Sequence, residues 1–136
     1  MKTKEIPIKT SFEEQIIDIT SKIEDALNKF KVKDGICNVF CPHTTAGLII
    51  NENADPSVKK DILMKLNKIV TEDPDYTHSE GNSSAHVKSS LVGVSLNIPV
   101  ANGKLLLGTW QGIMFCEFDG PRDRKVVISI IKPINL

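Results

Sequence analysis

The sequence predicts an α+β fold in which mainly antiparallel strands form a β-sandwich and two main helices pack against it. Three observations lead to this expectation. Apolar residues alternate with polar ones near the start of the chain, which is typical of half-buried strands. Two segments place apolar residues on one helical face at three- and four-residue spacing. Gly-containing pairs separate the apolar runs of the last third, as in hairpins.

The first thirty residues predict two strands followed by a helix. Isoleucines alternate with polar residues over residues 6–8 and again over 17–19, and a turn near Thr10 separates the two strands. Ser21 and Glu24 have the spacing of a capping box, which favours a helix start. The apolar face of this helix consists of Ile23, Ala26, Leu27 and Phe30.

The middle of the chain predicts two more strands and the second helix. ICNVF (36–40) and AGLIINE (46–52) are interpreted as strands, and we expect the second to be buried on both faces. Asp55 suits the N-cap position of a helix and Pro56 suits its first position. Apolar residues at helical spacing continue this helix to about Val70.

Four apolar runs fill the last third of the chain, at residues 94–98, 105–110, 113–118 and 125–131. Asn102-Gly103 and Asp119-Gly120 lie between these runs and suit hairpin turns. We therefore expect an antiparallel meander here. With 136 residues and no internal repeat or linker, the chain is expected to form one domain, residues 1–136.

Composition narrows the class of function. The formal net charge is zero, which argues against binding of nucleic acid or an anionic membrane through bulk electrostatics. The first ten residues, MKTKEIPIKT, hold no apolar stretch of signal-peptide length, and no apolar run approaches the roughly 18 residues that span a bilayer. Cys37 and Cys41 would lie about 13 Å apart in a strand, too far for a disulfide. We expect a cytoplasmic protein.

All three histidines lie in polar stretches rather than on an apolar face. Two threonines follow His43, and Asp75 precedes His78 by three positions. Imidazole is the commonest protein ligand of transition metals, and carboxylates orient such ligands. The seven residues between His78 and His86 do not form a standard zinc motif. A metal site and a set of solvated histidines therefore both remain open.

The segment GNSSAH (81–86) predicts a second kind of site, for an anion. Gly81 can adopt a positive φ, and Ser83 or Ser84 can cap a short helix whose free N–H groups favour phosphate. Three cations would add positive charge if the fold brought them close: Lys88, Arg122 and Arg124. An ordinary helix cap is the simpler interpretation of the same residues.

Two glutamates stand out from their apolar surroundings. Glu52 ends an apolar strand, where either a site or solvation of the strand end explains it. Glu117 lies inside an apolar run, and a buried carboxylate requires a partner. If the neighbours of Glu117 point inward, alternation along the strand places Glu117 in solvent instead. Trp110 suits either a core or interface position or a stacking face for a ring.

Three blocks of the sequence resemble the signature blocks of the YjbQ family: PHTTAGLIINENADPSVKKDI, DYTHSEGNSSAHVKSSLVG and NGKLLLGTWQGIMFCEFDGPR. The resemblance runs from about Cys41 to the C-terminus. It implies a YjbQ-like α+β fold built on a β-sandwich and a homotrimer around a threefold axis. It also implies a histidine-rich pocket near a subunit boundary that can hold a divalent metal ion, Zn²⁺ or Mg²⁺.

Members of this family are linked to thiamine phosphate synthase activity, which joins hydroxymethylpyrimidine diphosphate to thiazole phosphate and expels pyrophosphate. The resemblance therefore implies small phosphorylated metabolites as substrates. The expected metal ligands are His43, His78 and His86. The expected phosphate contacts are Thr44, Thr45, Gly81, Asn82, Ser83 and Arg122. The carboxylates expected to orient the histidines or move a proton are Glu52, Asp75 and Glu117.

Two other functions remain open. A metal-dependent hydrolase of a small phosphorylated metabolite would use the histidines and carboxylates to activate water. A non-catalytic trimeric module would bind a metal or a metabolite without turnover. In each case we expect no nucleic-acid partner and no membrane partner.

Overall fold

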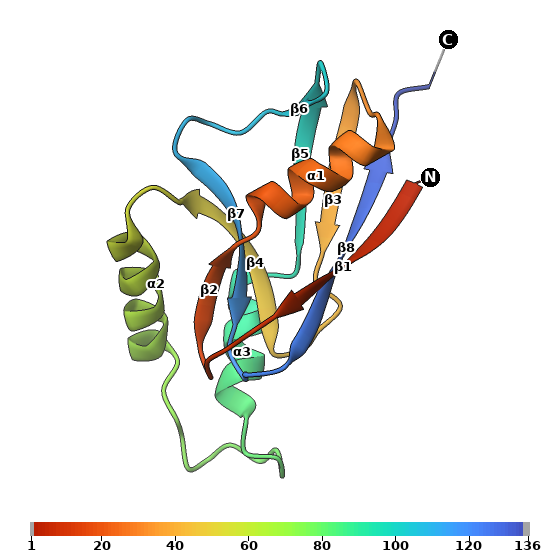
Figure 1. The fold of residues 1–136 in the computed structure, drawn as a ribbon. Helices are drawn as coiled ribbons and strands as arrows, with labels where there is room; N and C mark the ends of the chain where they lie inside the picture. The colour runs from red at the N-terminus through yellow and green to blue at the C-terminus, as the bar shows by residue number, and fades with distance from the viewer. Residues whose placement is uncertain (1, 135–136) are drawn as a thin grey trace.

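The computed structural model describes residues 2–134, which form eight strands and three helices (Figure 1). The strands are β1 (Lys2–Lys9), β2 (Gln15–Asp18), β3 (Gly35–Phe40), β4 (Ala46–Glu52), β5 (Ser95–Ala101), β6 (Lys104–Leu105), β7 (Gln111–Glu117) and β8 (Asp123–Ile131). The helices are α1 (Thr20–Phe30), α2 (Pro56–Ile69) and α3 (Ser83–Val92). The α+β prediction is confirmed, and α3 is the short helix expected after GNSS.

The strands form two antiparallel sheets. One sheet has the order β1-β8-β3-β5-β6, and the other has the order β2-β7-β4. Apolar residues of α1 and of both sheets share one core cluster between the sheets. A second cluster lies on the other face of the three-stranded sheet, where α2 and α3 cover it (Figure 1). The three-stranded sheet is therefore the middle layer of the molecule.

The central strand of this middle layer, β7, is buried on both faces. Ile113 and Phe115 belong to the cluster between the sheets, whereas Met114 and Cys116 belong to the cluster under α2 and α3. Exposure therefore does not alternate along β7, and every residue from Gly112 to Glu117 is buried. Alternation of exposure requires one solvated face, which this strand lacks.

The predicted C-terminal meander is wrong in part. Asn102 and Gly103 both have positive φ, 52° and 77°, and form the expected turn between β5 and β6. Asp119-Gly120, in contrast, connects β7 in the three-stranded sheet to β8 in the five-stranded sheet. This connection brings the start of β8 beside the end of β1. Directly outside the two strands, Thr10 N–H donates to the Arg122 carbonyl at 3.1 Å.

The observed helix start agrees with the sequence prediction for α2 and disagrees with it for α1. Asp55 is the N-cap of α2, and its carboxylate accepts from Ser57 N–H at 2.9 Å, as predicted. The predicted capping box at Ser21 and Glu24 is wrong, because the N-cap of α1 is Ile19, two residues before Ser21. Asp18 instead accepts from the N–H and the hydroxyl of Thr20, at 2.9 Å and 2.6 Å.

All three cysteines are buried free thiols. Burial raises the pKa of Cys37 to about 11 and that of Cys116 to about 12, so these thiols are neutral and unreactive at neutral pH. Among residues 2–134, no helix is long and apolar enough to cross a bilayer.

Candidate functional site

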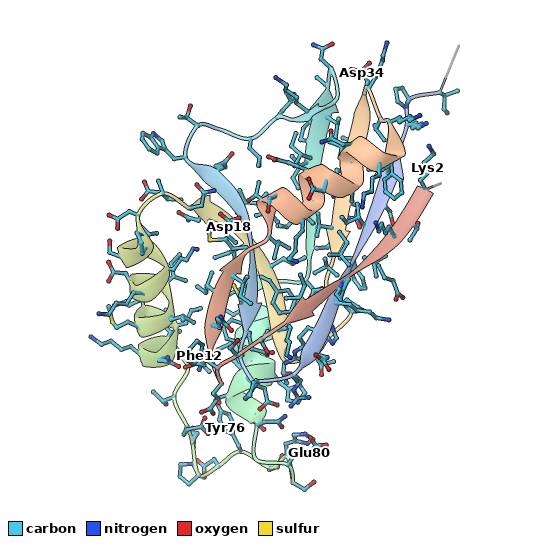
Figure 2. The ribbon with its side chains drawn as sticks, viewed as in Figure 1. Lys2, Phe12, Asp18, Asp34, Tyr76 and Glu80 are labelled. Atoms are coloured by element: carbon cyan, nitrogen blue, oxygen red, sulfur yellow. The ribbon has the colours of Figure 1, made fainter. Side chains whose placement is uncertain are left out.

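The loop between α2 and α3 brings His78 against His86 of α3. The centroids of the two rings lie 5.2 Å apart, and the ring planes are nearly perpendicular, at 85°. Figure 2 shows this loop at the lower end of the molecule, where Tyr76 and Glu80 are labelled. His78 is exposed and His86 is half-buried, so the pair is open to solvent.

His86 also lines two cavities. The first, of about 730 Å³, lies over the loop, and its lining includes Asp75, Tyr76, His78, Ser83 and His86. The second, of about 720 Å³, lies between α3 and the segment that joins β3 to β4, and its lining includes Phe40, His43, Thr44, His86 and Ser90. Each volume falls in the range of small-molecule sites. His86 is the histidine that both cavities share.

The main chain of β8 fixes the ring of His43. Its Nε2 lies 3.0 Å from Lys125 N–H and 3.1 Å from the Lys125 carbonyl oxygen. One neutral tautomer accepts from this N–H, and the other donates to this carbonyl. The register of β3 on β8 would place Pro42 opposite Lys125, and proline has no N–H to donate. The imidazole thus completes the hydrogen bonding of β8 where β3 ends.

Burial and then the charge of Arg124 lower the pKa of His43 from its ordinary value. The neutral imidazole is consequently favoured at neutral pH. A neutral ring is the form that binds a metal ion. The electrostatics of His43 are therefore compatible with its predicted role, although its Nε2 already has a main-chain partner.

The three cations that the sequence offered to a phosphate all have carboxylate partners. Lys88 is buried and pairs with Glu14 at 2.9 Å. Arg122 pairs with Asp119 at 2.9 Å, and half of its side chain remains exposed. Arg124 is buried against Glu117. Of the three, Arg122 is the one whose charge reaches solvent.

Of the two interpretations of Glu117, exposure to solvent is wrong and burial with a partner is confirmed. Glu117 is fully buried, because β7 is covered on both faces. Its Oε1 accepts from Arg124 Nε at 2.9 Å and from the Thr10 hydroxyl at 2.7 Å. Its Oε2 accepts from Arg124 Nη2 at 2.5 Å and from Asp119 N–H at 3.1 Å. Burial raises the pKa of this carboxyl, but these donors more than offset the effect and hold the pKa below its ordinary value.

The N-terminus of α3 lies beside the first cavity. Gly81 has φ +73°, as predicted, and Asn82 is the N-cap. Ser83 is the first helical residue and Ser84 donates to Glu72 at 2.5 Å, so the prediction that either serine caps the helix is wrong. Asn82 Nδ2 donates to Asp119 at 2.8 Å. Asn82 Oδ1 is the one side-chain polar atom in residues 2–134 that is buried without a partner.

Glu52 lies away from these residues. It ends β4, whereas Thr44 and Thr45 precede the first residue of that strand. The seven residues of β4 separate its two ends by about 20 Å. Trp110 lies at the Glu52 end, where its carbonyl accepts from Asn53 N–H, and 63% of its side chain is exposed. The fold therefore separates Glu52 and Trp110 from the histidines.

The histidines fit a metal ion in part. Within residues 2–134, no three His, Cys, Asp or Glu side chains lie close enough to hold an ion together. His78 and His86 fit as a pair of imidazole ligands, since their rings are in edge contact. His43 shares a cavity with His86 but does not join this pair. The three-histidine set therefore stays a prediction.

Sequence reasoning missed Asp119 and Thr10. Asp119 accepts from both Asn82 and Arg122, and Thr10 donates to Glu117. The pair Asp119-Gly120 looked like a hairpin turn, so the carboxylate was assigned to turn formation. A glutamate inside an apolar run, followed by Asp119 two positions later and by Arg122 and Arg124 five and seven positions later, was the signal that could have indicated a shared network.

Comparisons with known proteins agree with this fold over nearly the whole chain. The family model described as UPF0047 protein YjbQ-like matches residues 4–133. The UPF0047 protein MJ1081 of Methanocaldococcus jannaschii is 56% identical over 124 residues, which cover 91% of this chain and 90% of that protein. The UPF0047 protein YugU of Bacillus subtilis is 49% identical over 129 residues, which cover 94% and 98%.

Solved structures give the same result. An uncharacterised YjbQ/UPF0047 protein of Clostridium acetobutylicum superposes with a TM-score of 0.91 at 58% identity, covering 94% of this chain and 99% of that one. The hypothetical protein APE1520 of Aeropyrum pernix superposes with a TM-score of 0.92 at 36% identity, covering 98% and 100%. The fold and the sequence agree that this chain belongs to the UPF0047 family of YjbQ-like proteins.

Proposed function

We propose that the chain is a thiamine phosphate synthase-like transferase that joins hydroxymethylpyrimidine diphosphate to thiazole phosphate with release of pyrophosphate. The observation that supports this proposal best is the pair of cavities of similar volume that share His86. A reaction between two substrates requires two adjoining subsites whose contents meet at one point. His86 is the side chain at that point.

The N-terminus of α3 supports a phosphate or pyrophosphate in the first cavity. Ser83 lines this cavity and begins a helix of ten residues, whose first N–H groups lack partners within the helix. Arg122 is joined to the N-cap Asn82 through Asp119 and keeps half of its side chain exposed. It is therefore the cation best placed to contact a phosphate at this end of the molecule.

A divalent ion, Zn²⁺ or Mg²⁺, would be held by His78 and His86, and by His43 in the full predicted set. When bound, the ion would neutralise charge on the departing pyrophosphate. Asp75 lines the first cavity together with His78 and is the carboxylate assigned to orient that ring or to move a proton. Glu117 takes no such role, because it is fully buried and saturated with donors.

We further propose that the chain acts as a cytoplasmic homotrimer. Val87 and Leu91 lie one turn apart on α3, and 42% and 57% of their side chains are exposed. Val87 also lines the first cavity. A neighbouring subunit that covered these side chains would bury apolar surface and narrow an otherwise open cavity.

The test of the activity is incubation of the purified protein with both precursors and Mg²⁺, followed by chromatography of thiamine phosphate. We expect product above a heat-killed control, lost in His86→Ala and retained in Glu52→Gln, which changes a carboxylate at the far end of β4. No product above the control would refute the synthase. Hydrolysis of either precursor alone would indicate a hydrolase, and tight binding without turnover would indicate a binding module.

A further inference from the structure

The two segments that carry His43 and His86 come from different parts of the fold and contact different neighbours. His43 lies on the connection between β3 and β4, and its ring contacts the main chain of Lys125. His86 lies on α3, on the opposite side of the shared cavity. A site that uses both rings requires a fixed distance between these segments.

One buried ion pair contacts both segments. Arg124 Nη2 donates to the Thr45 hydroxyl at 2.8 Å and to the Thr45 carbonyl at 3.3 Å. The next residue, Lys125, holds the His43 ring by its N–H at 3.0 Å. This first branch runs from Glu117 through Arg124 to the segment that carries His43.

A second branch runs from the same carboxylate to α3. Glu117 Oε2 accepts from Asp119 N–H at 3.1 Å, which fixes the start of the connection to β8. Asp119 Oδ2 then accepts from Asn82 Nδ2 at 2.8 Å. The carbonyl of Asn82 accepts from His86 N–H at 3.3 Å, in the first turn of α3. A short series of hydrogen bonds therefore connects the Glu117 carboxylate to each of the two segments that carry the histidines.

The energetics of a buried ion pair also favour a positional role. Glu117 is fully buried and only 3% of the Arg124 side chain is exposed, so neither can contact a ligand in the cavity. Removing two charges from water offsets most of their attraction, and apolar side chains of similar volume are often as stabilising. A bidentate arginine–carboxylate contact, in contrast, fixes the position and orientation of both side chains.

We propose that the Glu117–Arg124 ion pair is a positioning pair that sets the placement of His43 relative to His86 in the ligand site. This inference rests on the proposed function only in that the two histidines form one site. It holds for any ligand of that site. Glu117 and Arg124 are positioning residues, and Thr45 and Asp119 carry their effect to the two segments.

The branches can be broken separately. Thr45→Val removes the hydroxyl that accepts from Arg124 and leaves the Asp119 branch intact. Asp119→Ala removes the acceptor of Asn82 and leaves the Thr45 branch intact. Glu117→Gln removes the charge common to both. Glu14→Gln is the matched control, because it breaks another, partly buried pair, with Lys88 on α3. Among residues 2–134, neither of these two side chains hydrogen-bonds to a member of either branch.

The readout is ring ¹⁵N spectra of the histidines together with amide hydrogen exchange at fixed pH, below the melting temperature of each variant. Thr45→Val should speed exchange of the Lys125 amide about tenfold and average the two His43 tautomers, with no change at His86. Asp119→Ala should speed exchange at His86 and leave His43 unchanged. Glu117→Gln should change both histidines, and Glu14→Gln should leave the His43 and Lys125 signals unchanged.

The inference is overturned if both branch variants leave the two histidines as in wild type, or if each branch variant disturbs both to the same extent. In either case the pair stabilises the fold without positioning the site. The two single-branch variants keep the test valid even if Glu117→Gln does not fold. These signals require neither metal nor substrate, so absence of thiamine phosphate in the activity assay would refute the synthase and leave this result standing.

Discussion

The two ends of β4 carry similar polar sequences and have different surroundings. His43, Thr44 and Thr45 precede the strand, and Asn51, Glu52 and Asn53 end it or follow it. At the first end lie a second histidine, the N-terminus of α3 and a cavity. At the second end, Asn53 donates to Asp18 at 3.0 Å. The start of α2 follows directly (Figure 1).

This difference teaches that polar residues at a strand end do not by themselves indicate a site. In an antiparallel sheet, each end of a strand meets the turns of its neighbours, and only the topology decides which chemistry gathers there. Glu117 pairs with Ala46 at the His43 end, and Gln111 pairs with Glu52 at the other. A buried ion-pair network lies close to the histidines at the first end. At the second end lie a side-chain hydrogen bond and the N-cap of α2.

The largest effect expected in this comparison is on stability at the His43 end. Glu117→Ala should lower the free energy of unfolding by about 3–5 kcal/mol, because it leaves the buried Arg124 charge without its partner. Urea denaturation of variant and wild type measures this. A loss below about 1 kcal/mol, the size expected for an exposed pair, would contradict the description of a buried, saturated carboxylate.

The next largest effect is expected on the pH dependence of stability, which should differ between the two ends of β4. The donors around Glu117 hold its pKa below the ordinary value of 4.5, so its stabilising contribution is complete above pH 4.5 and disappears as the pH falls through the lowered pKa. Burial raises the pKa of Asp18, at the other end of the middle sheet, but hydrogen bonds from Thr20 and Asn53 bring it below its ordinary value of 3.8.

Melting temperatures measured between neutral pH and pH 3 test this order. Glu117→Gln should flatten the pH dependence more than Asp18→Asn does, because Glu117 is fully buried and Asp18 is exposed. Equal flattening in the two variants would show that the networks at the two ends contribute equally, against the comparison.

The smallest effect is expected at the Glu52 end. Asn53→Ala removes one exposed hydrogen bond to Asp18 and should lower the free energy of unfolding by about 1 kcal/mol. It should leave the ring ¹⁵N signals of His43 and His86 unchanged. A shift of either histidine in this variant would mean that the two ends of β4 are coupled through the strand.

Local patterns predicted the elements well. Three of the four isoleucines lie in the predicted strands, whereas Ile19 follows β2 and is the N-cap of α1. The apolar face behind Ile23 and the Asp55-Pro56 helix start correspond to helices of the fold. These features depend on residues near one another in sequence. The contact between the His78 and His86 rings, in contrast, depends on how the loop between α2 and α3 folds back, and this depends on the whole fold.

Long-range packing decided three points that the sequence left open or predicted wrongly. Burial with a partner and exposure to solvent were both open for Glu117, and the two layers that cover β7 decide for burial. Asp119-Gly120 was expected to form a hairpin, but it joins the two sheets. The sequence left open whether Lys88, Arg122 and Arg124 reach a phosphate, and the fold pairs them with Glu14, Asp119 and Glu117, so that of the three Arg122 keeps half of its side chain exposed. No spacing in one sequence indicates which strand lies in the middle layer.

The central claim is that the ligand site lies at the His43 end of β4 and includes His86. Calorimetric titration of Zn²⁺ into wild type, His86→Ala and Glu52→Gln tests it most directly. We predict stoichiometric binding to wild type and to Glu52→Gln, and at least about tenfold weaker binding to folded His86→Ala, as expected when an imidazole ligand is removed. Unchanged stoichiometric binding by His86→Ala, or loss of binding in Glu52→Gln alone, would contradict it.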